Sequence, residues 1–173
     1  MKDNHLPKRK DIRLKEYDYD SAGAYFITIC TANRKHLLSK INPVGAIHES
    51  PVPQLTLCGQ IVKNILDNIP SRFKCSIDKY IIMPNHIHLL VSVNGDVRAI
   101  RESPLRGRSN LSKMIGYIKM NATKRIRERY GDIEVWQRGY YDHIIRNQAD
   151  YDDVYRYIEN NPTQWEQDEL YNE

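Results

Sequence analysis

Two histidines separated by a single residue form the most informative motif of this sequence. His86 and His88 lie within Pro-Asn-His-Ile-His-Leu-Leu-Val, residues 84–91, which otherwise has the pattern of a buried strand. Alternate residues of a strand point to the same face, so the two imidazoles are predicted to project side by side. Such a pair can bind one divalent ion on a rigid base. A histidine pair of this kind can also line the polar face of a sheet without binding metal. The metal interpretation therefore requires a further ligand and a reactive group elsewhere in the sequence.

The last predicted helix could supply both groups. In residues 150–162, Tyr157 and Asn161 are four positions apart and are therefore neighbours on one helical face. The amide oxygen of Asn161 would complete a His, His, amide set suited to Mg²⁺ or Mn²⁺. A phenol, with a pKa of about 10, becomes a nucleophile only when a base or a metal assists it. Once activated it could attack a phosphodiester whose charge the ion offsets. Tyr155 and Glu159 form a competing pair at the same spacing.

The hydrophobic pattern predicts the strands and helices that carry these groups. Strands are expected at residues 24–32, 75–83, 86–93 and, as one short strand, 135–136 with 140–145; helices are expected at 55–69, 111–129 and 150–160. This order describes a split βαββαβ unit followed by one more helix. The sequence therefore predicts an α+β, ferredoxin-like (RRM-like) fold: one antiparallel sheet with helices on one face, plus a C-terminal helix carrying the nucleophile.

Two of the predicted helices have apolar stripes that should face the core. The stripes consist of Leu57, Ile61, Ile65 and Ile69 in the first helix and Met114, Ile118, Ala122 and Ile126 in the second. Pro70 should end the first helix and Gly131 the second. Residues 33–53, rich in proline, should form a long loop or an inserted hairpin.

The 173 residues suggest a single domain large enough to bury a core. We expect a basic N-terminal arm over 1–23, the domain over 24–165 with a variable loop or insertion at 34–56, and a C-terminal tail over 166–173. No apolar run reaches the roughly 18 residues of a membrane span, and the N-terminus lacks the pattern of a signal peptide. The three widely spaced cysteines fit a reducing compartment, so we expect a cytoplasmic protein without a membrane partner.

Charge is distributed unevenly along the chain. Residues 130–173 hold 3 basic and 11 acidic side chains, a net −8, whereas residues 1–129 hold 23 basic and 11 acidic side chains, a net +12. A basic body favours a polyanionic partner such as nucleic acid. The candidate contacts lie in the loop before the second predicted helix and in that helix: Arg98, Arg101, Arg106, Arg108, Lys119, Lys124 and Arg125.

Taken in order, these motifs resemble those of a known family. From about residue 24 to residue 165 the chain is similar to the REP-associated tyrosine transposases, relatives of the single-tyrosine HUH transposases. Besides the cationic helix, the shared motifs are Met-Pro-Asn-His-Ile-His-Leu-Leu-Val (83–91), Val-Trp-Gln-Arg (135–138), Tyr-Tyr-Asp-His-Ile-Ile-Arg-Asn (140–147) and Asp-Tyr…Tyr-Ile-Glu-Asn-Asn-Pro (150–162). The HUH element alone is weakly specific, but all these motifs in this order are highly specific.

The resemblance implies a metal-dependent enzyme that cleaves and rejoins single-stranded DNA at or near hairpins. It makes His86, His88 and Asn161 the ligands of Mg²⁺ or Mn²⁺, and it makes Tyr157 the catalytic residue that forms a 5′-phosphotyrosine. The implied partner is single-stranded, hairpin-flanking DNA. Both monomers and homodimers occur among such proteins, and the sequence does not choose between them. His143 could contact DNA, orient a metal ligand or be structural, and its strand setting favours a structural role.

Two other functions are open. A non-catalytic protein derived from such a transposase would bind hairpin or single-stranded DNA with the same fold and charge. The joint presence of the two histidines, Tyr157 and Asn161 argues against it, because a protein that had lost cleavage would most easily lose one of the four. A histidine-triad nucleotide hydrolase needs a third alternating histidine, and this sequence has Leu90 there.

Overall fold

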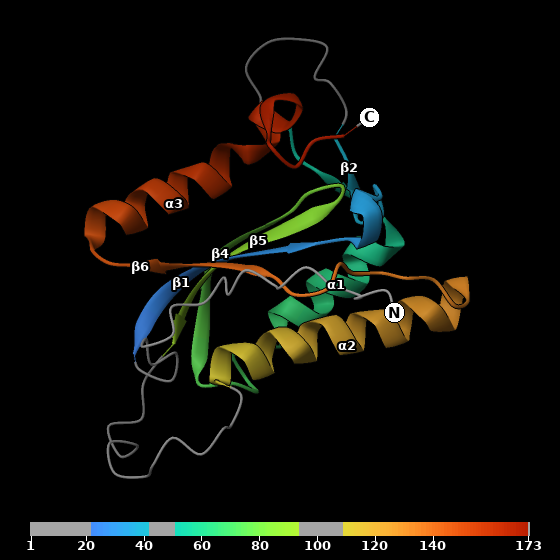
Figure 1. Cartoon of the computed structure of the whole chain (residues 1–173), viewed down its shortest axis with the longest axis horizontal. Helices are drawn as coiled ribbons and strands as arrows, with labels where there is room; N and C mark the ends of the chain where they lie inside the picture. Colours follow the sequence, from blue (N-terminus) through green and yellow to red (C-terminus); the bar gives the residue numbers. More distant parts are fainter. Residues whose placement is uncertain (1–21, 42–50, 94–108, 173) are drawn as a thin grey trace, which may run out of the picture.

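The computed structural model describes residues 22–41, 51–93 and 109–172. A four-stranded sheet runs through the middle of the molecule, with helices on both sides of it (Figure 1). The strands are β1 (Gly23–Cys30), β4 (Cys75–Ile82), β5 (His86–Val93) and β6 (Tyr141–Ile145). Their order is β4-β5-β1-β6, and every neighbouring pair is antiparallel. The predicted α+β, ferredoxin-like fold is confirmed.

The helices divide between the two faces of the sheet. Helices α1 (Leu57–Asp67) and α2 (Asn110–Tyr130) cover one face, while α3 (Gln148–Asn160) crosses the other (Figure 1). The chain enters α3 directly from β6 and leaves it into a 3-10 helix, η3 (Asn161–Gln167). The C-terminal residues that follow return toward the start of β5, where the two histidines lie.

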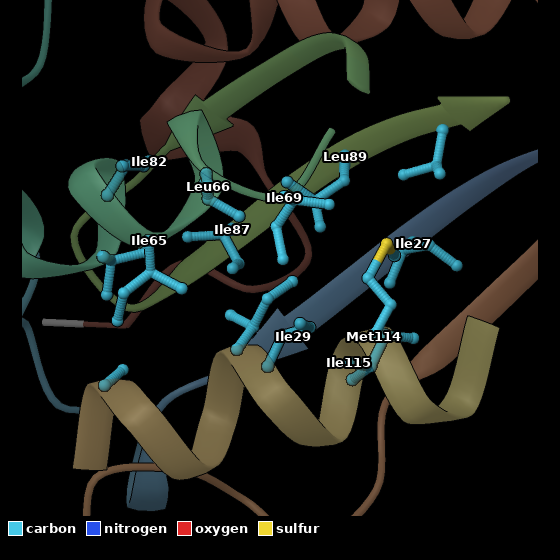
Figure 2. Close-up of a cluster of buried hydrophobic side chains, with 14 of the residues drawn as sticks. Ile27, Ile29, Ile65, Leu66, Ile69, Ile82, Ile87, Leu89, Met114 and Ile115 are labelled. Carbon is cyan, nitrogen blue, oxygen red and sulfur yellow. The ribbon is translucent and has the colours of Figure 1, made fainter. Parts of the chain in front are cut away.

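The core lies between the sheet and helices α1 and α2. Alternate side chains of β1 and β5, among them Ile27, Ile29, Ile87 and Leu89, point toward these helices. Figure 2 shows them packed against side chains of α1 and α2. The intervening residues of the same strands point to the α3 face, as the period of two requires.

Helix α2 follows its predicted pattern closely. The Ser109 hydroxyl caps it by accepting from the Ser112 N–H, and Gly131 ends it with a φ of 77°, a conformation that suits glycine. The predicted stripe is confirmed, because all four of its members are buried: Met114, Ile118, Ala122 and Ile126.

The predicted stripe of α1 is wrong at its first position. Leu57 is 45% exposed, and the buried side chains of this segment are those of Cys58, Val62, Ile65, Leu66 and Ile69. The buried residues recur at spacings of three and four, the pattern of one helical face, and this pattern begins at Cys58.

The fourth strand is shorter than predicted. Trp136 makes only an isolated bridge with Thr31, and the strand begins at Tyr141, beyond Gly139 with its φ of 84°. The last helix ends at Asn160, as predicted. Pro162 lies in the first turn of η3, where its missing N–H costs no hydrogen bond, so a 3-10 helix follows α3 directly.

The short strands β2 (Ser39–Lys40) and β3 (Gln54–Leu55) pair with each other within the segment expected to be a loop or inserted hairpin. Residues 42–50 between them lie outside the described residues, as do 1–21 and 94–108. Among the helices that the structure describes, none has the length and apolarity needed to cross a membrane.

Candidate metal centre and nucleophile

The two histidines project side by side from β5 onto the α3 face. Their ring centroids are 4.4 Å apart, and both side chains are almost fully buried. On the neighbouring strand, His86 is paired with Cys30 and His88 with Thr28. Strand alternation alone produces this arrangement, so the sheet fixes the spacing of the two imidazoles.

One nitrogen of each imidazole is held by a neighbour. Nδ1 of His88 lies 2.8 Å from the Thr28 hydroxyl oxygen, and Nδ1 of His86 lies 2.8 Å from the Asn85 side-chain oxygen. The Asn85 amide donates to the Leu170 carbonyl and to the Asn172 side-chain oxygen. Because its nitrogen is thus engaged, the Asn85 oxygen must accept, and the His86 Nδ1 must carry the proton. The lone pair of His86 is therefore on Nε2.

The Nε2 atoms of both histidines are buried and make no hydrogen bond within the described structure. The Asn161 Oδ1, at the junction of α3 and η3, shares this property. Its amide nitrogen donates to Asp168 Oδ2 at 2.6 Å, which leaves the oxygen free to act as a ligand. Buried polar atoms without partners are rare, and they call for an explanation such as a bound ion.

Tyr157 lies against the histidines. Its ring contacts His88 with a centroid separation of 5.4 Å and meets Phe26 edge-on at 5.8 Å. The Tyr157 hydroxyl lies 3.4 Å from Asp168 Oδ2, and the side chain is 42% exposed. A polymer could therefore reach this phenol from solvent.

Tyr155 occupies a different part of the α3 face. The Lys79 ammonium lies 4.5 Å from the centre of its ring and pairs with Glu159 at 2.9 Å. Lys79 belongs to β4, the edge strand, so Tyr155 and Glu159 are held beside β4. Of the two competing pairs on α3, the structure brings Tyr157 and Asn161 to the histidines.

Burial sets the protonation of the site. It lowers the pKa of His86 to about 4, an effect that the nearby Asp168 charge opposes. It also holds the pKa of His88 well below its ordinary value. Both imidazoles are thus neutral at physiological pH, the form that binds metal. Burial, followed by the negative charge of Asp168, raises the pKa of Tyr157 to about 12. The phenol therefore needs a positive charge nearby to become a nucleophile.

Asp168 is a site residue that the sequence did not reveal. Among the described residues, one ligand atom each from His86, His88 and Asp168 lie within 4.8 Å of one another. The carboxylate comes from the segment predicted to be a C-terminal tail. That segment is held against the site by Trp165, which packs 5.9 Å from the His86 ring, and by its hydrogen bonds with Asn85.

The other predicted site residues lie apart from the histidines or outside the described residues. Arg98, Arg101, Arg106 and Arg108 fall in residues 94–108 and are not described. Lys124 and Arg125 are exposed on α2, across the sheet from the histidines. Lys119 is half-buried, and its ammonium donates to the Gln137 and Gly139 carbonyls at 2.5 and 2.7 Å.

His143 is engaged at the start of α3. Its Nε2 lies 3.0 Å from both carboxylate oxygens of Asp150. Asp150 also accepts from the Arg146 N–H, while the Asn147 side chain caps α3 by accepting from the Asp150 N–H. His143 thus contributes to the β6–α3 junction that aims the helix, and it does not contact the histidine pair directly.

The available ligand atoms fit a divalent metal ion. Two neutral imidazole nitrogens and a carboxylate oxygen lie close together. The buried, unpartnered amide oxygen of Asn161 belongs to the side chain that donates to this carboxylate. Mixed nitrogen and oxygen sets of this kind suit Mn²⁺ and related first-row ions, and Mg²⁺ accepts them when water or phosphate oxygens complete the shell. Thr28 and Asn85 supply the outer hydrogen bonds that orient such ligands.

The fold and these residues define a class of protein: a ferredoxin-like sheet that presents an HxH pair beneath a tyrosine-bearing helix. The model of the family described as "Transposase IS200 like" matches residues 21–161. The chain belongs to the IS200-like transposase family.

Individual relatives agree with this assignment. An uncharacterised protein of Haemophilus influenzae is 40% identical over 174 residues, covering 94% of this chain and 93% of that protein. A second protein of that organism, named "Putative REP-associated tyrosine transposase", is 25% identical and covers 84% of this chain and 73% of its own length. A solved REP-associated tyrosine transposase bound to a REP hairpin has the same fold, with a TM-score of 0.60 at 21% identity, over 88% of this chain and 74% of that one. The predicted resemblance to REP-associated tyrosine transposases is confirmed.

Proposed function

We propose that this protein cleaves and rejoins single-stranded DNA at or near hairpins through a covalent bond to Tyr157. The family supports a function related to DNA transposition, and a relative of the same fold is bound to a hairpin. The observation that carries the proposal is the contact of the Tyr157 ring with His88, beside three buried ligand atoms that lack partners.

In the proposed reaction the Tyr157 hydroxyl releases its proton to solvent, and its oxygen attacks the phosphorus of a phosphodiester. The bond from phosphorus to the 3′ oxygen breaks, that oxygen takes up a proton as a 3′-OH, and the 5′ phosphate stays on the tyrosine. In the reverse step a 3′-OH attacks the phosphotyrosine, which restores a phosphodiester and releases the phenol. The bond energy is kept throughout, so rejoining needs no nucleotide cofactor.

A divalent ion held by His86, His88 and Asn161 would polarise the phosphate and offset the charge that develops on its oxygens. The protein's own side chains do the remaining work. Thr28 and Asn85 aim the imidazoles, and Phe26 together with His88 holds the Tyr157 ring edge-on. The half-exposed position of the phenol leaves room for a strand on its solvent side.

Covalent capture tests the proposal. A single strand flanking a hairpin is incubated with the protein and Mn²⁺, and adducts that resist denaturation are resolved on a gel and mapped by mass spectrometry. We expect a DNA-linked peptide containing Tyr157, its complete loss in Tyr157→Phe, and nearly unchanged hairpin binding by that variant. Tyr155→Phe is the matched control on the same helix and should retain the adduct.

The outcomes separate the two functions. An adduct that persists in Tyr157→Phe and disappears in Tyr155→Phe would move the nucleophile to Tyr155. If the wild-type protein binds hairpins with Mn²⁺ present but never forms an adduct, it is the non-catalytic DNA-binding protein instead. Binding should weaken steeply with salt in either case, because contacts to phosphates release counterions.

A further inference from the structure

We propose that Asp168 is a fourth protein ligand of this metal centre, supplied by the segment that follows the nucleophile helix. The inference rests on the proposed function, because it assumes that His86, His88 and Asn161 hold the ion. Asp168 would add an anionic ligand to three neutral ones.

The distances support direct coordination. One atom each from His86, His88 and Asp168 lie within 4.8 Å of one another. Opposite ligands of an ion with bonds of 2.0–2.2 Å are about 4.3 Å apart. Small movements of the side chains would therefore bring the three atoms around one ion.

The two carboxylate oxygens of Asp168 have different surroundings. Oδ1 accepts from the Leu170 N–H at 2.6 Å, which fixes the turn that carries the residue. Oδ2 faces the site, where it accepts from the Asn161 amide at 2.6 Å and lies 3.4 Å from the Tyr157 hydroxyl. One oxygen is thus an anchor, and the other lies beside the proposed ligands.

The negative charge of Asp168 would compensate part of the charge of the ion. His86, His88 and Asn161 are neutral ligands, and they would leave both charges of the ion without compensation in a buried place. Hard divalent cations such as Mg²⁺ and Mn²⁺ favour anionic oxygen, which Asp168 can supply.

The segment that carries Asp168 is tied to the histidines. The side chain of Asn85 both orients His86 and donates to the Leu170 carbonyl and the Asn172 side chain. Trp165 packs between the rings of His36 and His86 and next to Tyr171. The position of the carboxylate is therefore built into the fold around the site.

A competing explanation is that Asp168 only orients the Asn161 amide and the phenol. Asp168→Asn removes the negative charge but keeps one acceptor oxygen where the carboxylate uses two. Its Mn²⁺ affinity tests whether Asp168 matters to the ion, and direct detection of the carboxylate at the ion separates the two roles. Glu169→Gln is the matched control: it removes the same charge at the adjacent, exposed position.

The first measurement is Mn²⁺ affinity in the absence of DNA, read from the electron paramagnetic resonance signal of the free ion. We expect Asp168→Asn to weaken binding by at least roughly tenfold to a hundredfold, since even an outer hydrogen-bond partner is worth that much. Glu169→Gln should bind as the wild type does. Wild-type affinity in Asp168→Asn would overturn the inference while leaving the proposed function intact.

A second measurement needs no variant. Protein made by cell-free synthesis with aspartate labelled with ¹³C at its side-chain carboxylate is loaded with Mn²⁺, and electron–nuclear double resonance should detect a directly coordinated carboxylate carbon. Absence of that coupling, with histidine nitrogen couplings present, overturns the inference alone. Absence of both, or unchanged Mn²⁺ affinity after combined His86→Ala and His88→Ala substitution, means that the proposed metal centre itself is wrong.

Discussion

The two faces of the sheet are covered in different ways. Toward α1 and α2 the strands present isoleucine, leucine and valine, and these pack into one continuous apolar cluster (Figure 2). Toward α3 the same strands present Thr28, His86 and His88 among apolar residues such as Phe26 and Leu90, together with Lys79 at the edge. The period of two along β1 and β5 thus separates a stabilising face from a chemical one.

Several polar contacts help to hold helix α3 on the chemical face. The Tyr151 hydroxyl donates to Asp78 at 3.1 Å, Lys79 pairs with Glu159, and His143 contacts Asp150. Asp78 lies at the point where the pairing of β4 with β5 shifts register. The side chain of Ile158 alone is fully buried along the helix.

The apolar face helps the protein to tolerate the unfavourable burial of polar atoms in the site. Each buried polar atom that lacks a partner costs about 1–3 kcal/mol, and the site contains three of them. The apolar layer on the opposite face offsets this cost, because its burial does not depend on a bound ion or on DNA. Stability and chemistry can therefore be changed separately.

The largest effect is expected from the apolar face. Leu89→Ala removes a fully buried side chain next to His88 and should lower the free energy of unfolding by roughly 2–5 kcal/mol. The Mn²⁺ affinity of the folded fraction should stay within about twofold of wild type, because the imidazoles point the other way. Urea titration and Mn²⁺ binding check this pair of results. A large loss of affinity without loss of stability would contradict the separation of the faces.

On the chemical face the order of effects should reverse. Thr28→Val leaves the His88 Nδ1 without its hydrogen-bond partner, which should cost about 1–3 kcal/mol in stability and roughly 10–100-fold in metal affinity. The affinity loss is large because the imidazole is no longer aimed at the ion. Calorimetric titration with Mn²⁺ measures it, and Thr123→Val on α2 is the control. Equal affinities in the two variants would show that Thr28 does not orient His88.

Local patterns were enough to predict much of the fold and part of the site. The stripe of α2 and the strands β1, β4 and β5 follow from periodicity, because each residue's environment repeats along the element. The alternation that places His86 beside His88 follows from strand geometry alone. Tyr157 and Asn161 could be paired because Asn161 caps the helix that carries Tyr157 and keeps helical backbone angles, so a spacing of four residues still means proximity.

Features that depend on distant contacts could not be predicted. Asp168 is one of several acidic residues near the C-terminus, and nothing in its spacing connects it to histidines eighty positions earlier. Its role follows only from the return of the chain after η3, held by Asn85 and Trp165. The orienting role of Asn85 was hidden for the same reason. In α1, several apolar residues on adjacent faces left the choice of stripe to tertiary packing.

The smallest effect is expected at the anchoring of α3. Tyr151→Phe removes the hydroxyl that donates a hydrogen bond to Asp78. The loss should lower the local stability of α3 by about 0.5–1.5 kcal/mol and leave the rest of the domain unchanged. Hydrogen exchange followed residue by residue tests where the cost falls. In the wild type, α3 amides should already exchange faster than those of α2, since fewer apolar contacts hold the helix. In the variant, α3 should exchange about 2–10-fold faster still, while α2 is unchanged. Equal acceleration in both helices would mean that α3 opens only with the whole domain, and that the helix carrying Tyr157 is as firmly fixed as the core.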